Sequence, residues 1–229
     1  MSKLRFFFLV KLLLSMLKTT IIFFLITKIL FSQNFTIARI DYSGGGDWYS
    51  DPSSLPNLLE FLSKNTPMSS ISKEERIKVT DPNAIHFPYF YLTGHGNIKF
   101  SDEEIIALRS LLNNGAFLHA DDNYGMDPSF RREMKKVYPN KDFIELPYSH
   151  EIFKSYYVFK NGLPKIHEHD NKPPQALGLF ENDRLIVLYT YESDLGDGWE
   201  NPSIHNNPWE KREAALKMGV NIIYFALTQ

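Results

Sequence analysis

The residues most capable of chemistry lie in two short turns, each of which follows an apolar run. Asp121 and Asp122 end one such run, and His95 stands between two glycines after another. Adjacent carboxylates at a strand end repel, which tends to raise one pKa or to recruit a cation. Asp121, Asp122 and His95 are therefore candidate catalytic groups, as general acid or base or as ligands of a divalent metal. The structural alternative is that Asp121 accepts hydrogen bonds from turn amides while Asp122 caps the following turn.

The elements that position these groups form a strand–helix–strand unit. Residues 87–92 and 116–120 are short, nearly all-apolar runs, as expected of strands covered on both faces. Between them, Ser101 and Glu104 have the spacing of a capping box and open an amphipathic helix. A unit of this length predicts a right-handed parallel crossover, with ligands beyond the carboxyl ends of its strands.

Further ligand-binding candidates come from other predicted turns. The glycine loop after the first strand, residues 43–46, lacks the spacing and the lysine of a phosphate-binding loop. It therefore gives only weak support for nucleotide binding, and we expect its backbone to shape a cleft instead. With His95, Asp121 and Asp122, the candidates are Gly44, Gly45, Gly46, Asp47, Trp48, Gly94, Gly96 and His150.

Histidines offer a second interpretation of the same cleft. His119 and Asp121 should share a face of their strand, as a buried hydrogen-bonded pair or as a catalytic dyad. Together with His95 and His150 they would give a nitrogen and oxygen set suited to zinc, although no metalloenzyme spacing supports it. We expect His167 and His169 in a solvated, proline-rich loop. No cofactor is assigned, and a divalent metal stays an alternative.

Aromatic residues in predicted loops point to a polyhydroxylated ligand. Ring faces stack on sugars and carboxylates accept bonds from their hydroxyls, so a glycan or another polar small molecule is a candidate ligand. The structural alternative is that the loop aromatics pack on one another. They are Trp48, Tyr49, Tyr124, Trp199 and Trp209.

The N-terminal 33 residues differ from the rest of the chain. They carry five basic residues, no acid and two apolar blocks. Residues 16–33 have the charged and apolar regions of a secretory signal, with Met16 as an alternative start. We expect cleavage near Ser32 or Gln33 and a periplasmic or secreted protein; the alternative is an uncleaved anchor. Lys28 leaves the second block well short of the ~20 residues that span a bilayer.

Composition narrows the function classes. The 229 residues include no cysteine, which excludes disulfides and thiolate catalysis. Without the five basic residues of the N-terminal segment, 20 basic residues face 27 acidic ones and no basic cluster appears. This balance argues against nucleic acid and anionic membranes as partners. Residues 34–229 are enough for one α/β domain.

The remaining pattern alternates strands and helices, which predicts a doubly wound, mainly parallel sheet with one antiparallel insertion. Glu192 to Pro208 is expected to be a long polar loop. The further expected strands are 35–40, 77–79, 142–146, 176–180 and 185–191. One further expected helix starts at Ser53 or Ser54, a second runs from Pro128 to Val137, and a third covers residues 209–226.

Longer motifs resemble a known family. They are Arg39 to Tyr42 with Gly44 to Tyr49, Tyr91 to Gly96, Gly115 to Asp122, Phe130 to Glu133, Leu146 to Phe153, and Ser193 to Trp199. They resemble the bacterial domain of unknown function numbered 4159 across residues 34–229. The resemblance implies a three-layer architecture similar to class I glutamine amidotransferases (flavodoxin-like) and to the trehalose-utilisation domains. It implies no activity, and without a cysteine nucleophile amidotransferase chemistry cannot operate.

Three hypotheses follow for function. The first is an exported domain that binds a polar ligand, such as a glycan, in the cleft of His95, Asp121 and Asp122. The second is a metal-assisted hydrolase that uses the same cleft with His150. The third is a non-enzymatic protein-interaction component of the envelope, which an exposed apolar patch away from the cleft would favour.

Overall fold

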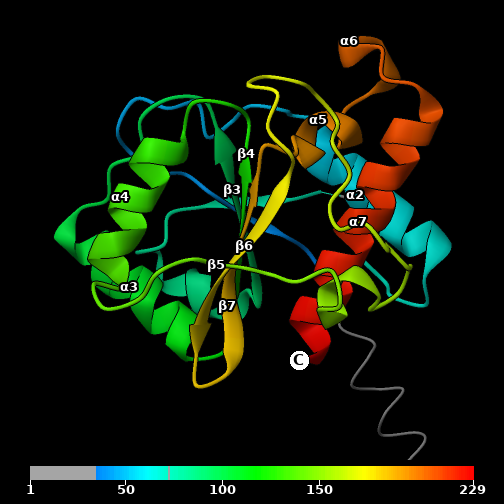
Figure 1. The fold of residues 1–229 in the computed structure, drawn as a ribbon. Helices are drawn as coiled ribbons and strands as arrows, with labels where there is room; N and C mark the ends of the chain where they lie inside the picture. The colour runs from blue at the N-terminus through cyan, green and yellow to red at the C-terminus, as the bar shows by residue number, and fades with distance from the viewer. Residues whose placement is uncertain (1–34, 72) are drawn as a thin grey trace, which may run out of the picture.

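The computed structural model describes residues 35–71 and 73–229, so the proposed signal segment, residues 1–33, lies outside the described residues. The described chain is a mixed α/β fold around a seven-stranded sheet in the order β2-β1-β3-β4-β7-β6-β5 (Figure 1). The strands are β1 (Ala38–Ile40), β2 (Glu75–Ile77), β3 (Tyr89–Gly94), β4 (Phe117–Asp122), β5 (Ile144–Glu145), β6 (Gln175–Glu181) and β7 (Arg184–Tyr191).

Most of the sheet is parallel, as the alternation of elements predicts. β1 pairs in parallel with β2 and β3, β3 with β4, and β4 with β7. β6 runs antiparallel between β7 and β5, which is the expected insertion. The carboxyl ends of β1, β3, β4 and β7 therefore meet at one end of the sheet, which we call the carboxyl edge.

Helices cover both faces of this sheet and make three layers (Figure 1). On one face, α3 (Asp102–Asn113) and α4 (Asp127–Val137) bury Leu108 and Phe130 against the sheet. On the other, α2 (Ser54–Asn65) and α7 (Trp209–Thr228) bury Leu58 and Ile222.

Local signals explain several element boundaries. Ser101 and Glu104 form the expected capping box at the start of α3, which satisfies two amides that the helix itself cannot. Pro128 lies in the first turn of α4, where its missing N–H costs nothing.

Some elements differ from the sequence prediction. β2 lies two residues earlier than expected, because Glu75 pairs with Ala38 at the start of β1. The expected loop between Glu192 and Pro208 contains two short helices, α5 (Leu195–Trp199) and α6 (Pro202–His205). Two 3-10 turns, η1 (Pro82–His86) and η2 (Glu151–Phe153), were also not predicted. Within the described residues, no helix has the length and apolar character needed to cross a membrane.

Candidate functional site

Two glycine turns interlock at the carboxyl edge, after β1 and after β3. The Gly46 amide donates to the Asn97 carbonyl (2.9 Å), and the Asn97 side-chain amide donates to the Gly44 carbonyl (2.9 Å). Gly44 has φ +119°, and a Cβ there would lie 2.6 Å from the Lys99 nitrogen. Gly94 has φ +139° and faces the Tyr42 hydroxyl, so neither of these two positions accepts a larger residue.

This interlock presents Asp47 and His95 as a pair. The His95 amide donates to Asp47 Oδ1, and His95 Nδ1 lies 3.0 Å from Asp47 Oδ2. The His95 side chain is 56% exposed and the Asp47 side chain is 34% exposed, so both can reach a molecule in solvent. Gly45 and Gly96, which neighbour this pair in the sequence, have open space where a Cβ would be.

Trp48, another sequence candidate, is held in place by its surroundings. Its ring packs against the core and lies 5.9 Å from the Arg76 guanidinium, while its carbonyl accepts from Arg39. The neighbouring Tyr49 ring packs edge-on against Trp48 and is 58% exposed. Tyr49 is the ring of this pair that solvent can reach.

Asp121 is fully buried and takes the structural role that the sequence left open. Its Oδ2 accepts from the Gly196 amide (2.6 Å) and the Tyr91 hydroxyl (3.4 Å). Its Oδ1 accepts from the Thr190 hydroxyl and the Leu195 amide. Burial raises the pKa of Asp121, while the bonds from Thr190 and Gly196 act to lower it. The carboxylate thus fixes the first turn of α5.

His119 shares a face with Asp121, as strand alternation predicts, and the two are linked through Thr190. His119 Nε2 lies 3.0 Å from Thr190 Oγ1, and its Nδ1 lies 3.0 Å from the Tyr89 hydroxyl. The Thr190 hydroxyl donates its hydrogen bond to Asp121, so its oxygen can only accept from His119. We therefore assign the His119 proton to Nε2. Burial lowers the pKa of His119 to about 3, so the ring is neutral.

Asp122 points to the opposite face of the sheet from Asp121. It lies near Asp127 of α4, is 3% exposed, and its Oδ1 has no hydrogen-bond partner among the described residues. Burial and Asp127 raise the pKa of Asp122 to about 6. The two adjacent carboxylates therefore do not act as one cation site, because the pleat separates them.

His150 lies away from the other candidates. It caps η2, where its Nδ1 accepts from the Ile152 amide (3.2 Å), and its ring packs against Phe225 near the end of α7. Burial lowers the pKa of His150. The contacts of His150 are thus with η2, β6 and α7, and within the described chain they include none of the other candidates.

The structure brings together a second group of titratable side chains that was not expected from the sequence. Asp51, Asp194 and Asp197 gather around α5, with His167 and His205 beside Asp197. Burial and Asp197 raise the pKa of Asp51 to about 7 and that of Asp194 to about 8. Carboxyls that titrate near neutrality are typical of functional sites.

The signal for this second group was present in the motif Ser193 to Trp199, which carries Asp194 and Asp197. Its glycines are required by close packing around the site. A Cβ on Gly196 would lie 2.9 Å from Asp51 Oδ2 and 3.0 Å from the Tyr91 hydroxyl. Without the fold, nothing in the sequence pairs this motif with His167 or His205.

The fold and the site define a mixed α/β domain whose polar groups gather where mostly parallel strands end. The family model for the domain of unknown function DUF4159 matches residues 36–227, and the chain belongs to this family. The comparison with curated proteins returns no match.

Proposed function

We propose that this domain binds a polar ligand, with a glycan as the leading candidate, at the carboxyl edge of its sheet. The observation that carries the proposal is the exposed Asp47–His95 pair, which two interlocked glycine turns hold in one geometry. A carboxylate and an imidazole in this arrangement can accept and donate hydrogen bonds to ligand hydroxyls.

Exposed aromatic rings beside this pair support a sugar. Tyr124 is 47% exposed and stacks on the His169 ring with centroids 4.4 Å apart. Its turn lies against the His95 turn, because a Cβ on Gly125 would lie 3.9 Å from the Gly96 nitrogen. Tyr49 adds a second exposed ring next to Asp47. Rings beside hydrogen-bonding side chains suit the mixed polar and apolar faces of a pyranose.

The hydrolase hypothesis rests on Asp121 or Asp122 with His95 and His150, and the surroundings of Asp121 weigh against it. Both Asp121 oxygens accept bonds from the protein. A general base needs reach to the proton that it removes, and buried Asp121 has none. The proposed relation to the class I glutamine amidotransferase-like superfamily is supported by the mostly parallel sheet. The chain has no cysteine, so the proposed function includes no amidotransferase activity.

We further propose that the protein is exported to the periplasm or beyond the cell. The support is the sequence of residues 16–33, with its basic start and its apolar block. An exported domain would meet envelope glycans, which agrees with the proposed ligand class.

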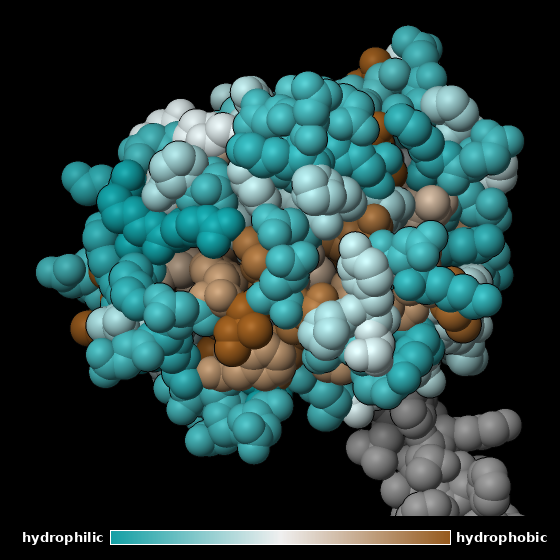
Figure 2. Space-filling model, in the orientation of Figure 1, coloured by the Kyte–Doolittle hydropathy of each residue, from teal (hydrophilic) through white to brown (hydrophobic). Residues whose placement is uncertain are grey.

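A second candidate function is protein interaction, and one surface favours it. Figure 2 shows apolar surface gathered in the region where Figure 1 shows β5 to β7. Ile144 on the short edge strand β5 is 60% exposed. Beside it, Arg131, Lys135, Phe143 and Leu179 line a cavity of about 410 Å³. Exposed apolar surface on an edge strand is typical of a contact with another protein.

A glycan array of bacterial envelope saccharides, probed with the full-length protein, tests the proposed function. The best-binding saccharide is then titrated calorimetrically against the wild type, Asp47→Asn and His95→Gln. We expect each variant to bind at least about tenfold more weakly, since one hydrogen bond to a charged group contributes ~1.5–3 kcal/mol.

His86→Gln is the matched control, because His86 is an exposed histidine in η1, before β3. It should bind as the wild type does. The proposal fails if no saccharide binds, or if Asp47→Asn binds with wild-type affinity. If no saccharide binds and another protein binds through the apolar surface at β5, the second candidate function is favoured.

A further inference from the structure

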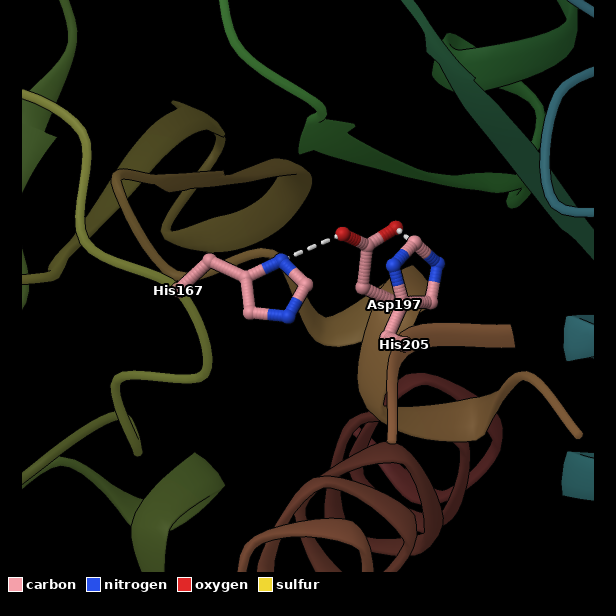
Figure 3. Close-up of side chains that lie close together, drawn as sticks. All are labelled: His167, Asp197 and His205. Carbon is pink, nitrogen blue, oxygen red and sulfur yellow. Dashed lines mark ion pairs between the residues drawn. The ribbon is translucent and has the colours of Figure 1, made fainter. Parts of the chain in front are cut away.

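Three side chains from separate segments meet near α5. His167 comes from the loop before β6, Asp197 from α5 and His205 from the end of α6 (Figure 3). His167 Nδ1 lies 2.6 Å from Asp197 Oδ2, and His205 Nε2 lies 3.3 Å from Asp197 Oδ1. One ligand atom from each of the three lies within 4.8 Å of the others.

This set has the chemistry of a transition-metal site. Two imidazoles and one carboxylate are ligands that zinc and its neighbours accept, and three protein ligands leave a fourth position open. A tetrahedral zinc ion with bonds of about 2.1 Å holds its ligand atoms roughly 3.4 Å apart. The observed separations from Asp197, 2.6 Å to His167 and 3.3 Å to His205, involve its two different oxygens, and the three ligand atoms lie within 4.8 Å of one another. Rotation of these side chains would therefore be needed to arrange them around an ion.

The surroundings supply a second, independent indication. Asp194 is buried, with a side chain 1% exposed, and its Oδ2 pairs with His169 Nε2. Its Oδ1 has no hydrogen-bond partner among the described residues. A buried carboxylate oxygen without a partner is costly, and a nearby cation or its bound water would offset that cost. Asp51 adds a further carboxyl close to Asp197.

Solvent can reach the three side chains without unfolding. The exposed fractions are 26% for His167, 13% for Asp197 and 28% for His205. An ion could therefore enter from solution and keep a water molecule or a ligand group as its fourth ligand. The group differs from the Asp121 and Asp122 pair considered from sequence, and it shares no residue with the Asp47–His95 pair.

We propose that His167, Asp197 and His205 bind one divalent transition-metal ion, with zinc as the reference ion. The proposal goes beyond the proposed function and does not depend on it. Bound zinc would tie the loop before β6 to α5 and α6, and it would present a Lewis acid at the same edge of the sheet as the Asp47–His95 pair.

Isothermal titration of the metal-free full-length protein with Zn²⁺ tests the proposal. Co²⁺ provides a second readout, because its absorption reports a tetrahedral site with imidazole ligands. We expect one ion per chain, and at least about 100-fold weaker binding in His167→Ala and His205→Ala. Loss of a group that only supports a ligand already costs about 10–100-fold, so loss of a ligand should cost no less.

His86→Ala is the control, because it removes an exposed histidine outside this cluster. It should leave zinc affinity and the cobalt spectrum unchanged. Thermal melts in EDTA establish that each variant is folded, and His205→Ala alone suffices if His167→Ala does not fold. The proposal is overturned if the wild type binds no zinc, if both cluster variants bind it as the wild type does, or if His86→Ala weakens binding equally.

Discussion

Two of the histidine–aspartate groups at the carboxyl edge contain the same residue types and differ in their surroundings. His119 and Asp121 lie in the sheet and are fully buried, whereas His167 and Asp197 lie in loops and short helices and are partly exposed. Burial lowers the pKa of His119 to about 3. A hydrogen bond to Asp197 raises the pKa of His167. The two groups therefore differ because of their surroundings and not because of their residue types. His119 and Asp121 form a buried scaffold, whereas His167 and Asp197 can exchange protons and ligands with solvent.

The buried group is saturated with internal partners. Hydrogen bonds run from Tyr89 through His119 and Thr190 to Asp121, and from there to the amides at the start of α5. Trp199 of α5 packs on the His119 ring with centroids 6.0 Å apart. The network therefore positions α5, and α5 in turn carries Asp197 to the exposed group.

The largest expected effect comes from breaking the buried group. Asp121→Ala should lower the free energy of unfolding by about 3–5 kcal/mol, because buried donors of Gly196, Thr190 and Leu195 lose their acceptor. Urea unfolding at neutral pH measures the change.

Asp47→Ala is the matched comparison, since Asp47 also accepts from a turn amide but is partly exposed. Its cost should stay below about 1 kcal/mol. Equal losses in the two variants would contradict the division of the edge into a buried scaffold and an exposed group.

A smaller effect is expected from pH and Asp194. Its folded-state pKa of about 8 lies above the ordinary 3.8, so the folded chain holds the proton more tightly than the unfolded chain does. Stability from this group is complete below the ordinary pKa and is lost as pH rises through the folded value. Asp194→Asn cannot ionise and should lose less stability between about pH 5 and pH 8 than the wild type, by on the order of 2 kcal/mol.

Urea unfolding at the two pH values, with EDTA present to remove metal, measures this difference. Asp51 and Asp122, with pKa values of about 7 and about 6, act in the same direction and remain in the variant, so some pH dependence should persist. An unchanged pH dependence in Asp194→Asn would show that Asp194 ionises normally.

Much of the fold follows from local patterns in the sequence. The apolar runs before Gly94 and Asp121, and the capping box of Ser101 and Glu104, each act within a few residues. α5 could not be predicted in this way. It is five residues long, contains two glycines, and its first amides are satisfied by Asp121, 74 and 75 positions earlier in the chain.

The candidate site was predictable only in part for the same reason. His95 and Asp47 can be predicted as site residues from the sequence, because glycines after an apolar run indicate a turn at a strand end. His167 and His205 were not identified, because their meeting at Asp197 depends on where α5 and α6 pack. The sequence also could not decide between the two roles of Asp121, since that choice depends on which amides reach it.

The central claim is that the buried group is scaffold while the loop group exchanges protons with solvent. An NMR pH titration of the histidine rings in the metal-free protein tests it most directly, with signals assigned through the His167→Ala variant. We expect the His119 ring to stay neutral down to about pH 4, and His167 to lose its proton only above its ordinary pKa near 6.5. Protonation of His119 near that ordinary value, or loss of the His167 proton below it, would contradict the account.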